Sequence, residues 1–227
     1  MMIKAVKNII IISNGRFGDA VYLKKKIAEM QDRLIICCDG AAYNMAQAKI
    51  KPDVIIGDMD SINAAQLENY RMTGIEIIKY PSEKDFTDTE LALDYALKLD
   101  PVRVHIWGAL GGRIDHTLAN IFLLKKGDEA GIKTCLLDEY GEAFLAQKEV
   151  VFTDAIGCTV SILALSPKAE GITLNGFAYL LNNETLRKGE TRGLSNYIKE
   201  SPARINFLSG ELLVIRYWQN NLFPEAA

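Results

Sequence analysis

The chain has 227 residues, 26 basic and 29 acidic side chains for a formal net charge of −3, and 49% hydrophobic residues. This apolar content supplies a large core and excludes a disordered chain, and the length allows one or two domains at ~100–200 residues each. The balanced charge argues against a broad basic surface for nucleic acid or anionic lipid, so we expect neither nucleic acid nor a membrane as partner.

The apolar runs and the cysteines together predict a cytoplasmic location. The longest early apolar run, Ile9–Ile12, is too short for a signal-peptide core or for a membrane span, which needs ~20 apolar residues. The four cysteines form no CxxC pair, and two histidines give little support for a zinc site. We therefore expect reduced, buried thiols.

Short β-branched runs alternate with helix-compatible stretches through the first 144 residues. The runs predict strands at 8–13, 34–38, 54–57, 75–79 and 103–108, and the stretches predict helices at 20–30, 41–49, 64–71, 88–99 and 116–125. Asp85 or Thr87 can cap the helix that begins at residue 88, and Glu90 stands at capping-box distance from Thr87. The alternation predicts a Rossmann-like α/β domain at residues 1–144, with a mostly parallel sheet flanked by helices.

The pattern changes after about residue 144. Apolar runs at 158–165, 171–174, 178–181, 204–207 and 212–217 are separated by Gly, Asn, Ser and Pro, with no amphipathic helix among them. This pattern predicts a small all-β sandwich or barrel domain at residues 145–227.

Acidic side chains follow the predicted strands of the first domain. Of the 14 aspartates, 13 precede residue 150. Those that the prediction places at the ends of strands are Asp39, Asp58, Asp60, Asp85, Asp88 and Asp115. The carboxyl ends of parallel strands meet at the edge of the sheet where ligands bind. We therefore expect a rim of carboxylates, whose mutual repulsion is costly without a cation.

The motif Asp58-Met59-Asp60 is the sharpest acidic signal. In an extended segment, residues i and i+2 point the same way, so both carboxylates could face one cation. Oxygen ligands without His or Cys suit Mg²⁺, which often shares its coordination with substrate phosphates. A lone motif of this kind is also typical of an Asx turn, with Asp60 and Ser61 capping the next helix, but four acidic strand ends favour the metal.

A glycine-rich turn from Gly108 to Arg113 separates a predicted strand from a predicted helix. Its amides could approach phosphate and Arg113 could bind it bidentately, although tight turns also use glycine for steric reasons. The chain has no Walker A loop, and we interpret His116 as a hydrogen-bonding residue at the helix start rather than an acid–base catalyst. The turn and the carboxylates predict a magnesium–polyphosphate site for phosphoryl or nucleotidyl transfer, with the acceptor undetermined.

At these residues the chain resembles the thiamin pyrophosphokinase family. The matching stretches are CDGAA (38–42), PDVIIGDMDSI (52–62), EKDFTDTELAL (83–93), GGRIDHTLAN (111–120) and TRGLSN (191–196). The resemblance extends from Asn14 to Ser209-Gly210. It implies transfer of the pyrophosphoryl group of ATP to thiamin, giving thiamin diphosphate and AMP. It also implies a catalytic α/β domain, a thiamin-binding β-sandwich and a homodimer with active sites between the subunits.

The resemblance also implies roles for individual residues. Asp58 and Asp60 match magnesium ligands, and Asp88 joins them or polarises the nucleophile, which makes all three catalytic. The positions that match ATP-binding residues are Asp39, Lys84, Asp85, Gly111, Gly112, Arg113 and Asp115. The positions that match thiamin-binding residues are Tyr179, Ser195 and Asn196.

Two of these positions depart from other members of the family. Tyr179 stands where animal members carry a tryptophan, and Lys84 stands where some members carry glutamine. A tyrosine keeps a π face for stacking, so stacking on thiamin remains available. By local sequence alone, Ser195-Asn196 is equally typical of a plain turn, and Tyr179 is typical of a core or surface residue of the sandwich.

Two other classes of function remain open from the sequence. A metal-dependent nucleotide-sugar transferase would use Asp58 and Asp60 as its DxD motif, but it gives no reason for the TRGLSN segment. A non-catalytic regulator that binds thiamin or a nucleotide would be stabilised by its ligand without releasing AMP.

Overall fold

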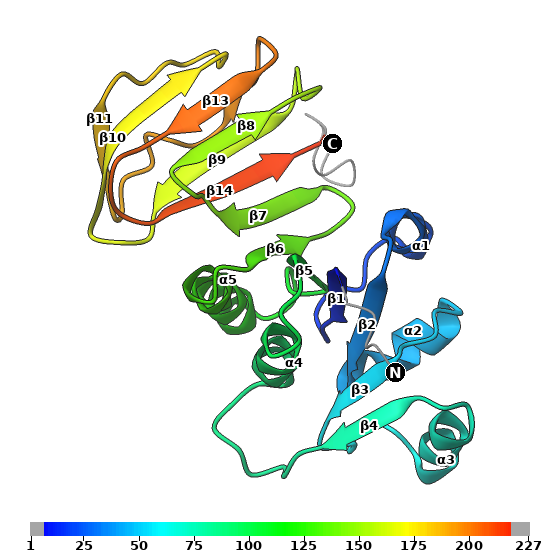
Figure 1. Cartoon of the computed structure of the whole chain (residues 1–227). Coiled ribbons are helices and arrows are strands. Elements are labelled where there is room, and N and C mark those ends of the chain that lie inside the picture. The colour runs from blue at the N-terminus through cyan, green and yellow to red at the C-terminus, as the bar shows by residue number, and fades with distance from the viewer. Residues whose placement is uncertain (1–6, 219–227) are drawn as a thin grey trace. The chain divides into compact units, whose positions relative to one another are not determined.

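Figure 1 shows the computed structural model of the chain, which describes residues 7–218. The chain divides into two compact units, residues 1–139 and residues 140–227. Within the described residues, no helix combines the length and the apolar character needed to cross a membrane.

The first unit is built on a parallel sheet. Its strands are β1 (Asn8–Ile12), β2 (Arg33–Cys38), β3 (Val54–Gly57), β4 (Glu76–Lys79), β5 (Arg103–Trp107) and β6 (Lys133–Leu137). They lie in the order β4-β3-β2-β1-β5-β6, and every pairing between them is parallel. The central strand β1 is flanked on both sides, which explains why Ile9 to Ile12 are all 0% exposed.

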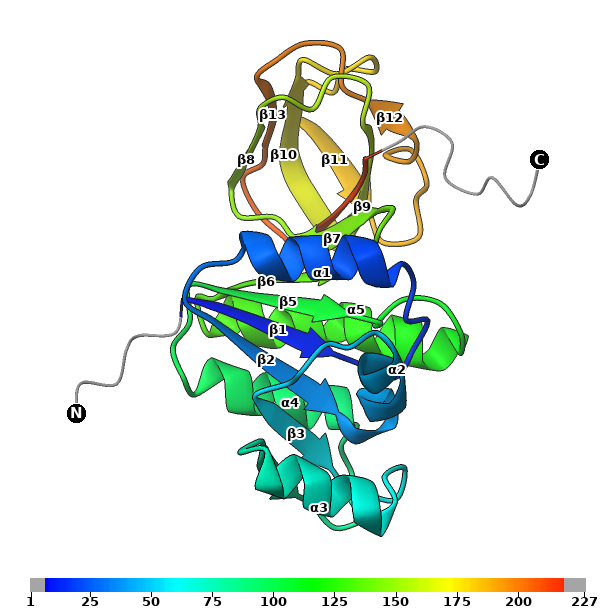
Figure 2. The ribbon, with the colours of Figure 1, turned by 90° about the vertical axis from the view of Figure 1, so that its right-hand side faces the viewer.

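Helices cover both faces of this sheet. They are α1 (Ala20–Glu29), the 3-10 turn η1 (Asp39–Ala41), α2 (Ala42–Gln47), α3 (Ala64–Met72), α4 (Asp88–Leu97) and α5 (Ile114–Glu129). Figures 1 and 2 show α4 and α5 on one face and α1 and α2 on the other. Thr87 caps α4 by accepting a hydrogen bond from the Glu90 N–H, as the sequence predicts.

The predicted elements of this unit are all present. The five predicted strands and the first four predicted helices have observed ends within about two residues of the expected ones. Helix α5 is longer than predicted at both ends, and strand β6 is an addition that the sequence analysis did not find. The predicted mostly parallel sheet flanked by helices is confirmed.

The second unit consists of two antiparallel sheets. Their strands are β7 (Gly141–Leu145), β8 (Glu149–Phe152), β9 (Thr159–Ala164), β10 (Lys168–Asn175), β11 (Glu184–Arg187), β12 (Asn196–Tyr197), β13 (Ala203–Asn206) and β14 (Leu212–Tyr217). One sheet has the order β12-β9-β14-β7 and the other β11-β10-β13-β8. Ile162 and Val214 of the first pack with Ile172 and Ile205 of the second in one buried cluster, so the predicted sandwich is confirmed.

One expected apolar run of the second unit is not a strand. Residues 178–181 form bends and irregular backbone beside an isolated bridge between Phe177 and Ile198. The run is held instead by the side chain of Asn196, which bonds the backbone of Tyr179. Four further strands, β7, β8, β11 and β12, were not predicted from the sequence.

Candidate active site

The predicted acidic residues lie at the carboxyl ends of the strands. Asp39 begins η1 directly after β2, Asp58 directly follows β3, and Asp88 begins α4 after the loop that leaves β4. Asp115 lies in the first turn of α5, after the glycine-rich turn that leaves β5. The chain leaves β1 for a helix on one face and β5 for a helix on the other, and such switch points are where open α/β sheets bind ligands.

Three of these carboxylates converge. Among the described residues, one carboxylate oxygen from each of Asp39, Asp58 and Asp60 lies within 4.8 Å of the others. Asp39 is buried, Asp58 is half-buried and Asp60 is exposed, so the cluster opens from the sheet edge towards solvent. This acidic cluster is the centre of the candidate site.

Asp39 is held rigidly at the base of the acidic cluster. Its carboxylate accepts hydrogen bonds from the Gly40 N–H at 2.6 Å and from the Met59 N–H at 2.8 Å. A Cβ at Gly57 would collide with this carboxyl group, so the end of β3 approaches Asp39 closely because residue 57 is glycine. Burial, followed by the charge of Asp88, raises the pKa of Asp39 to about 6.

Asp58 and Asp60 converge by a turn and not by the predicted extended backbone. Met59 has a φ of 67°, and the Asp60 N–H donates to Asp58 Oδ1 at 3.2 Å. This is an Asx turn, and its hydrogen bond is the main cause that lowers the pKa of Asp58. The expected alternative, in which Asp60 caps the next helix, is wrong because Asn63 caps α3 in a capping box with Gln66.

The acidic cluster fits a hard divalent cation. Carboxylate oxygens without nitrogen or sulfur ligands are the donor set that Mg²⁺ prefers. The spacing of the three oxygens allows one ion to share them, and a cation would offset the charge of Asp88, which adds to burial in raising the pKa of Asp39.

Asp88 lies beside the acidic cluster and is paired with a cation of its own. The Lys84 ammonium lies 2.9 Å from Asp88 Oδ1, and both residues are half-buried. Burial alone would lower the pKa of Lys84, but its hydrogen bond to Asp88 and the nearby carboxylates raise it, so the ammonium stays charged. Asp85 is exposed in the same loop.

The glycine-rich turn leads directly into α5. Gly108, Gly111 and Gly112 all have positive φ, between 69° and 80°, which favours glycine at each position. The guanidinium of Arg113 contacts both carboxylate oxygens of Asp115, at 3.1 and 2.6 Å. This contact is the main cause that lowers the pKa of Asp115 to about 2, and both side chains remain exposed.

The loop after β1 connects these parts of the site, and the sequence analysis did not assign it a role. The hydroxyls of Ser13 and Thr89 lie 2.6 Å apart, and the Gly15 N–H donates to the Gly108 carbonyl at 2.8 Å. A Cβ at Gly40 would collide with the side chain of Asn14. The sequence carries one signal for a role of this loop, because a polar stretch directly follows the first apolar run at the end of a predicted strand.

The residues predicted to bind thiamin lie together in the second unit. The Asn196 amide oxygen accepts from the Tyr179 N–H at 3.0 Å, and its amide nitrogen donates to the Tyr179 carbonyl at 2.7 Å. The rings of Tyr179 and Tyr197 pack edge to face, with 6.1 Å between their centroids. Tyr179 is 66% exposed, and Ser195 is exposed with a φ of 55°. Asn196 is itself buried, and its side-chain amide forms hydrogen bonds that hold Tyr179.

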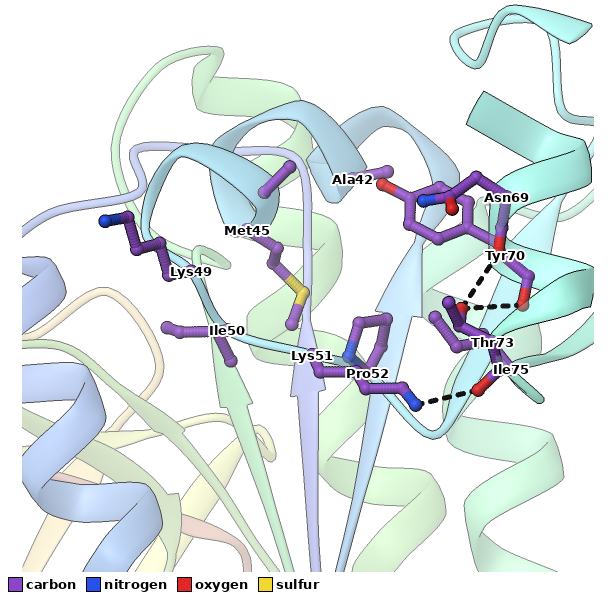
Figure 3. Close-up of a pocket in the computed structure, with 11 residues that line it drawn as sticks. Ala42, Met45, Lys49, Ile50, Lys51, Pro52, Asn69, Tyr70, Thr73 and Ile75 are labelled. Carbon is purple, nitrogen blue, oxygen red and sulfur yellow. Dashed lines mark hydrogen bonds between the residues drawn. The ribbon is translucent and has the colours of Figure 1, made fainter. Parts of the chain in front are cut away.

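Figure 3 shows a separate hollow of about 340 Å³ between α2, the following loop and α3. Met45, Ile50 and Tyr70 contribute to its wall, and Lys51, which also lines it, donates to the Thr73 carbonyl at 2.8 Å. None of the described residues that line the hollow is among the predicted site residues. The acidic cluster, and not this hollow, is therefore the candidate active site.

Comparison with known families agrees with the chemistry of the site. A model described as "Thiamin pyrophosphokinase, catalytic domain" matches residues 26–136, and one described as "Thiamin pyrophosphokinase, vitamin B1 binding domain" matches residues 147–212. The chain belongs to the thiamin pyrophosphokinase family. The predicted family resemblance is confirmed.

Individual members of the thiamin pyrophosphokinase family match over most of their length. The chain is 35% identical to the thiamine pyrophosphokinase of Bacillus subtilis over 81% of its own length and 86% of that relative. It superposes on the crystal structure of the Bacillus subtilis thiamine pyrophosphokinase with a TM-score of 0.82, covering 94% of this chain and 100% of that one. A Geobacillus thermodenitrificans thiamin pyrophosphokinase superposes with a TM-score of 0.78 at 26% identity, covering 95% and 99%.

Proposed function

We propose that this protein transfers the pyrophosphoryl group of ATP to the hydroxyl of thiamin at the acidic cluster, giving thiamin diphosphate and AMP. The single observation that carries the proposal is the convergence of Asp39, Asp58 and Asp60 within 4.8 Å, in a chain of the thiamin pyrophosphokinase family. A cluster of oxygen ligands suits a reaction between a magnesium–polyphosphate and an alcohol.

In this proposal Asp58 and Asp60 hold Mg²⁺, and Asp39 and Asp88 complete the charged wall around it. Bound there, the ion would neutralise phosphate charge. The amides of Gly111 and Gly112 and the guanidinium of Arg113 bind the polyphosphate from the glycine-rich turn. Asp85 and Asp115 belong to the same ATP-binding segment, and Lys84 supplies a fixed positive charge beside it because its ion pair with Asp88 keeps the ammonium charged.

The reaction exchanges one oxygen–phosphorus bond for another. The hydroxyl oxygen of thiamin forms a bond to the β-phosphorus of ATP, the bond from that phosphorus to the oxygen bridging to the α-phosphorus breaks, and AMP leaves. Asp88 orients the hydroxyl and accepts its proton late. In a loose transition state the hydroxyl needs little help from a base. The positioning of the substrates and the stabilisation of phosphate charge therefore dominate the rate.

We assign ATP and magnesium to residues 1–144 and thiamin to residues 145–227. Tyr179 offers an exposed ring for stacking and Ser195 an exposed hydroxyl, while Asn196 contributes by holding Tyr179 in position. The cytoplasmic location stays a prediction, as does the absence of nucleic-acid and membrane partners.

We also propose that the protein is a homodimer with active sites at the subunit interface. Helix α5, which begins beside Arg113, carries an exposed apolar row at spacing i, i+4 and i+8. Ile114 is 78% exposed, Leu118 50% and Phe122 56%. A second copy of the chain would remove this row from water, and the row's start beside Asp115 would bring the copy to the ATP-binding segment.

Light scattering tests the dimer. Wild-type protein should have the mass of two chains, and Leu118→Glu should shift it towards one chain because a charge would be buried at the interface. Met72→Glu is the matched control, because Met72 is also an exposed apolar residue of a helix but belongs to α3 and not to this row. It should leave the dimer intact. A monomeric wild type at micromolar concentration contradicts the proposal.

Incubation of the purified protein with ATP, Mg²⁺ and thiamin tests the function. We expect thiamin diphosphate and AMP in equal amounts, and no product when EDTA exceeds the metal. Release of ADP with thiamin monophosphate, or ligand binding without AMP release, would contradict it.

A further inference from the structure

Arg16 lies against the glycine-rich turn. A Cβ built on Gly111 would stand 3.1 Å from Arg16 Cβ and 3.5 Å from Arg16 Cδ, so the stem of the arginine runs along the turn. One residue earlier, the Gly15 N–H donates to the Gly108 carbonyl at 2.8 Å. The loop after β1 therefore contacts the turn at both its beginning and its middle.

The guanidinium of Arg16 extends beyond the turn to the end of β6. Its Nη1 lies 2.6 Å from Glu139 Oε1 and its Nη2 lies 3.5 Å from Asp138 Oδ2. These two acids directly follow β6, and the strand order is β1-β5-β6. Because β5 lies between the other two strands, the arginine crosses over the turn that leaves β5 and joins the loops on either side of it.

The glycine-rich turn needs contacts with other segments of the chain to hold its conformation. Three of its residues are glycines at positive φ, and glycine has no side chain to pack and loses the most freedom on ordering. The carboxylates that anchor Arg16 are 17% and 14% exposed, whereas Arg16 is 40% exposed. The anchor is therefore less exposed to water and salt than an ordinary surface ion pair, and its contribution is correspondingly larger.

We propose that Arg16 is a positioning residue for ATP: by fastening the glycine-rich turn between the β1 and β6 loops, it fixes the amides and Arg113 that bind the polyphosphate. The inference rests on the proposed function, because it assigns ATP to this turn. Arg16 acts through the turn and does not touch the reacting atoms.

Two substitutions separate the parts of this role. Arg16→Met keeps a long stem against Gly111 but removes the ion pair with Glu139. Arg16→Lys keeps a positive charge within reach of the two acids. We expect Arg16→Met to raise the KM for ATP about tenfold, as for loss of a charged hydrogen bond, and to leave the KM for thiamin within about twofold. Arg16→Lys should recover most of the loss.

The matched control is Arg204→Met, which removes an ion pair of 2.8 Å with Glu149 in the second unit. It should leave both KM values unchanged. If Arg16→Met lowers the melting temperature but leaves the KM for ATP unchanged, or raises both KM values equally, Arg16 is merely structural and the inference is wrong.

Calorimetric titration with a non-hydrolysable ATP analogue and Mg²⁺ separates this inference from the proposed function. We expect Arg16→Met to bind the analogue about tenfold more weakly than wild type. If wild type binds the analogue but forms no thiamin diphosphate, the proposed function fails while this comparison still decides the role of Arg16. Equal affinity of the two proteins overturns the inference.

Discussion

The carboxylate of Asp39 accepts a hydrogen bond of 2.8 Å from the backbone N–H of Met59. This bond joins the loop after β2 to the loop after β3, and it fixes the residue between the two aspartates of the Asp58-Met59-Asp60 turn. One carboxylate therefore serves both as a predicted ATP-binding group and as the support for its neighbours, so the acidic cluster is built as a unit.

Gly57→Ala should disturb the buried carboxylate of the acidic cluster. A Cβ at residue 57 would collide with the carboxyl group of Asp39, which is buried and cannot move away. We expect the free energy of unfolding to fall by about 2 kcal/mol, a typical cost of overpacking, and thiamin diphosphate formation to fall with it. Urea unfolding and a product assay measure the two effects.

Gly74→Ala is the control for this substitution. Gly74 has a positive φ of 75°, so alanine there is strained, but its Cβ would meet no atom within 4 Å. It should lose stability without a specific loss of turnover. If Gly74→Ala and Gly57→Ala reduce turnover equally, the close approach of Gly57 to Asp39 does not matter.

Asp60→Asn should abolish turnover and leave the fold intact. Asp60 is exposed, and its carboxylate accepts a hydrogen bond from the hydroxyl of the neighbouring Ser61. We expect product formation to fall at least about a hundredfold, because a metal ligand is worth several kcal/mol in the transition state. The melting temperature should stay within a few degrees. Asp154→Asn, on an exposed loop of the second unit, should leave turnover at the wild-type level.

Asn196→Ala should impair thiamin binding selectively. The substitution removes the acceptor of the Tyr179 and Tyr197 N–H groups and the donor to the Tyr179 carbonyl. We expect the KM for thiamin to rise about tenfold and the KM for ATP to stay unchanged, because the exposed ring loses its position. Tyr179→Phe, which keeps the ring, should behave as wild type, and Tyr179→Ala should resemble Asn196→Ala. Equal changes in both KM values would remove Asn196 from the thiamin site.

His105 should make stability depend on pH. Burial, followed by the charges of Arg103 and Lys26, lowers its pKa from 6.5 to about 4, and Cys135 Sγ lies 3.2 Å from its Nδ1. Between pH 6.5 and 4, His105 binds a proton in the unfolded chain but not in the folded chain. The contribution of His105 to the free energy of unfolding should therefore fall by up to about 3 kcal/mol as the pH drops through that range. The raised pKa of Asp39 acts in the opposite direction there, so the informative quantity is the difference between wild type and a His105 variant.

Urea unfolding of wild type and His105→Gln at pH 7 and pH 5 checks this dependence. The variant should lose less stability than wild type on acidification, because residue 105 no longer carries a group that titrates in this pH range. His116→Gln, at an exposed position of α5, should keep the wild-type dependence. Identical pH dependence in His105→Gln and wild type would show that His105 does not cause it.

Patterns within a few residues predicted most of the first unit. The Thr87 cap, the apolar run at Ile9–Ile12 and the acidic strand ends are all local signals, and each corresponds to an observed feature. The convergence of Asp58 and Asp60 was also expected, but for the wrong reason. It depends on the left-handed backbone of Met59, a conformation that is uncommon for methionine and is stabilised by Asp39, 20 residues away.

Features that depend on distant partners escaped the sequence analysis. Arg16 meets Glu139 across 123 residues, so nothing near either residue predicts the contact. Strand β12 has only two residues, Asn196 and Tyr197, and exists because β9 supplies its partners. The Asn196 amide then holds residues 178–181 in place although they form no strand. The spacing of hydrophobic residues in the sequence does not indicate such a contact.

Metal-dependent turnover of Asp60→Cys tests whether the acidic cluster holds the metal ion of pyrophosphoryl transfer, as we propose. A thiolate binds soft ions better than Mg²⁺. We predict that this variant forms almost no thiamin diphosphate with Mg²⁺, and that Mn²⁺ or Cd²⁺ restores it while giving no such gain to wild type or Asp154→Asn. Equal loss of activity with all three metals would show that residue 60 does not bind the catalytic metal ion.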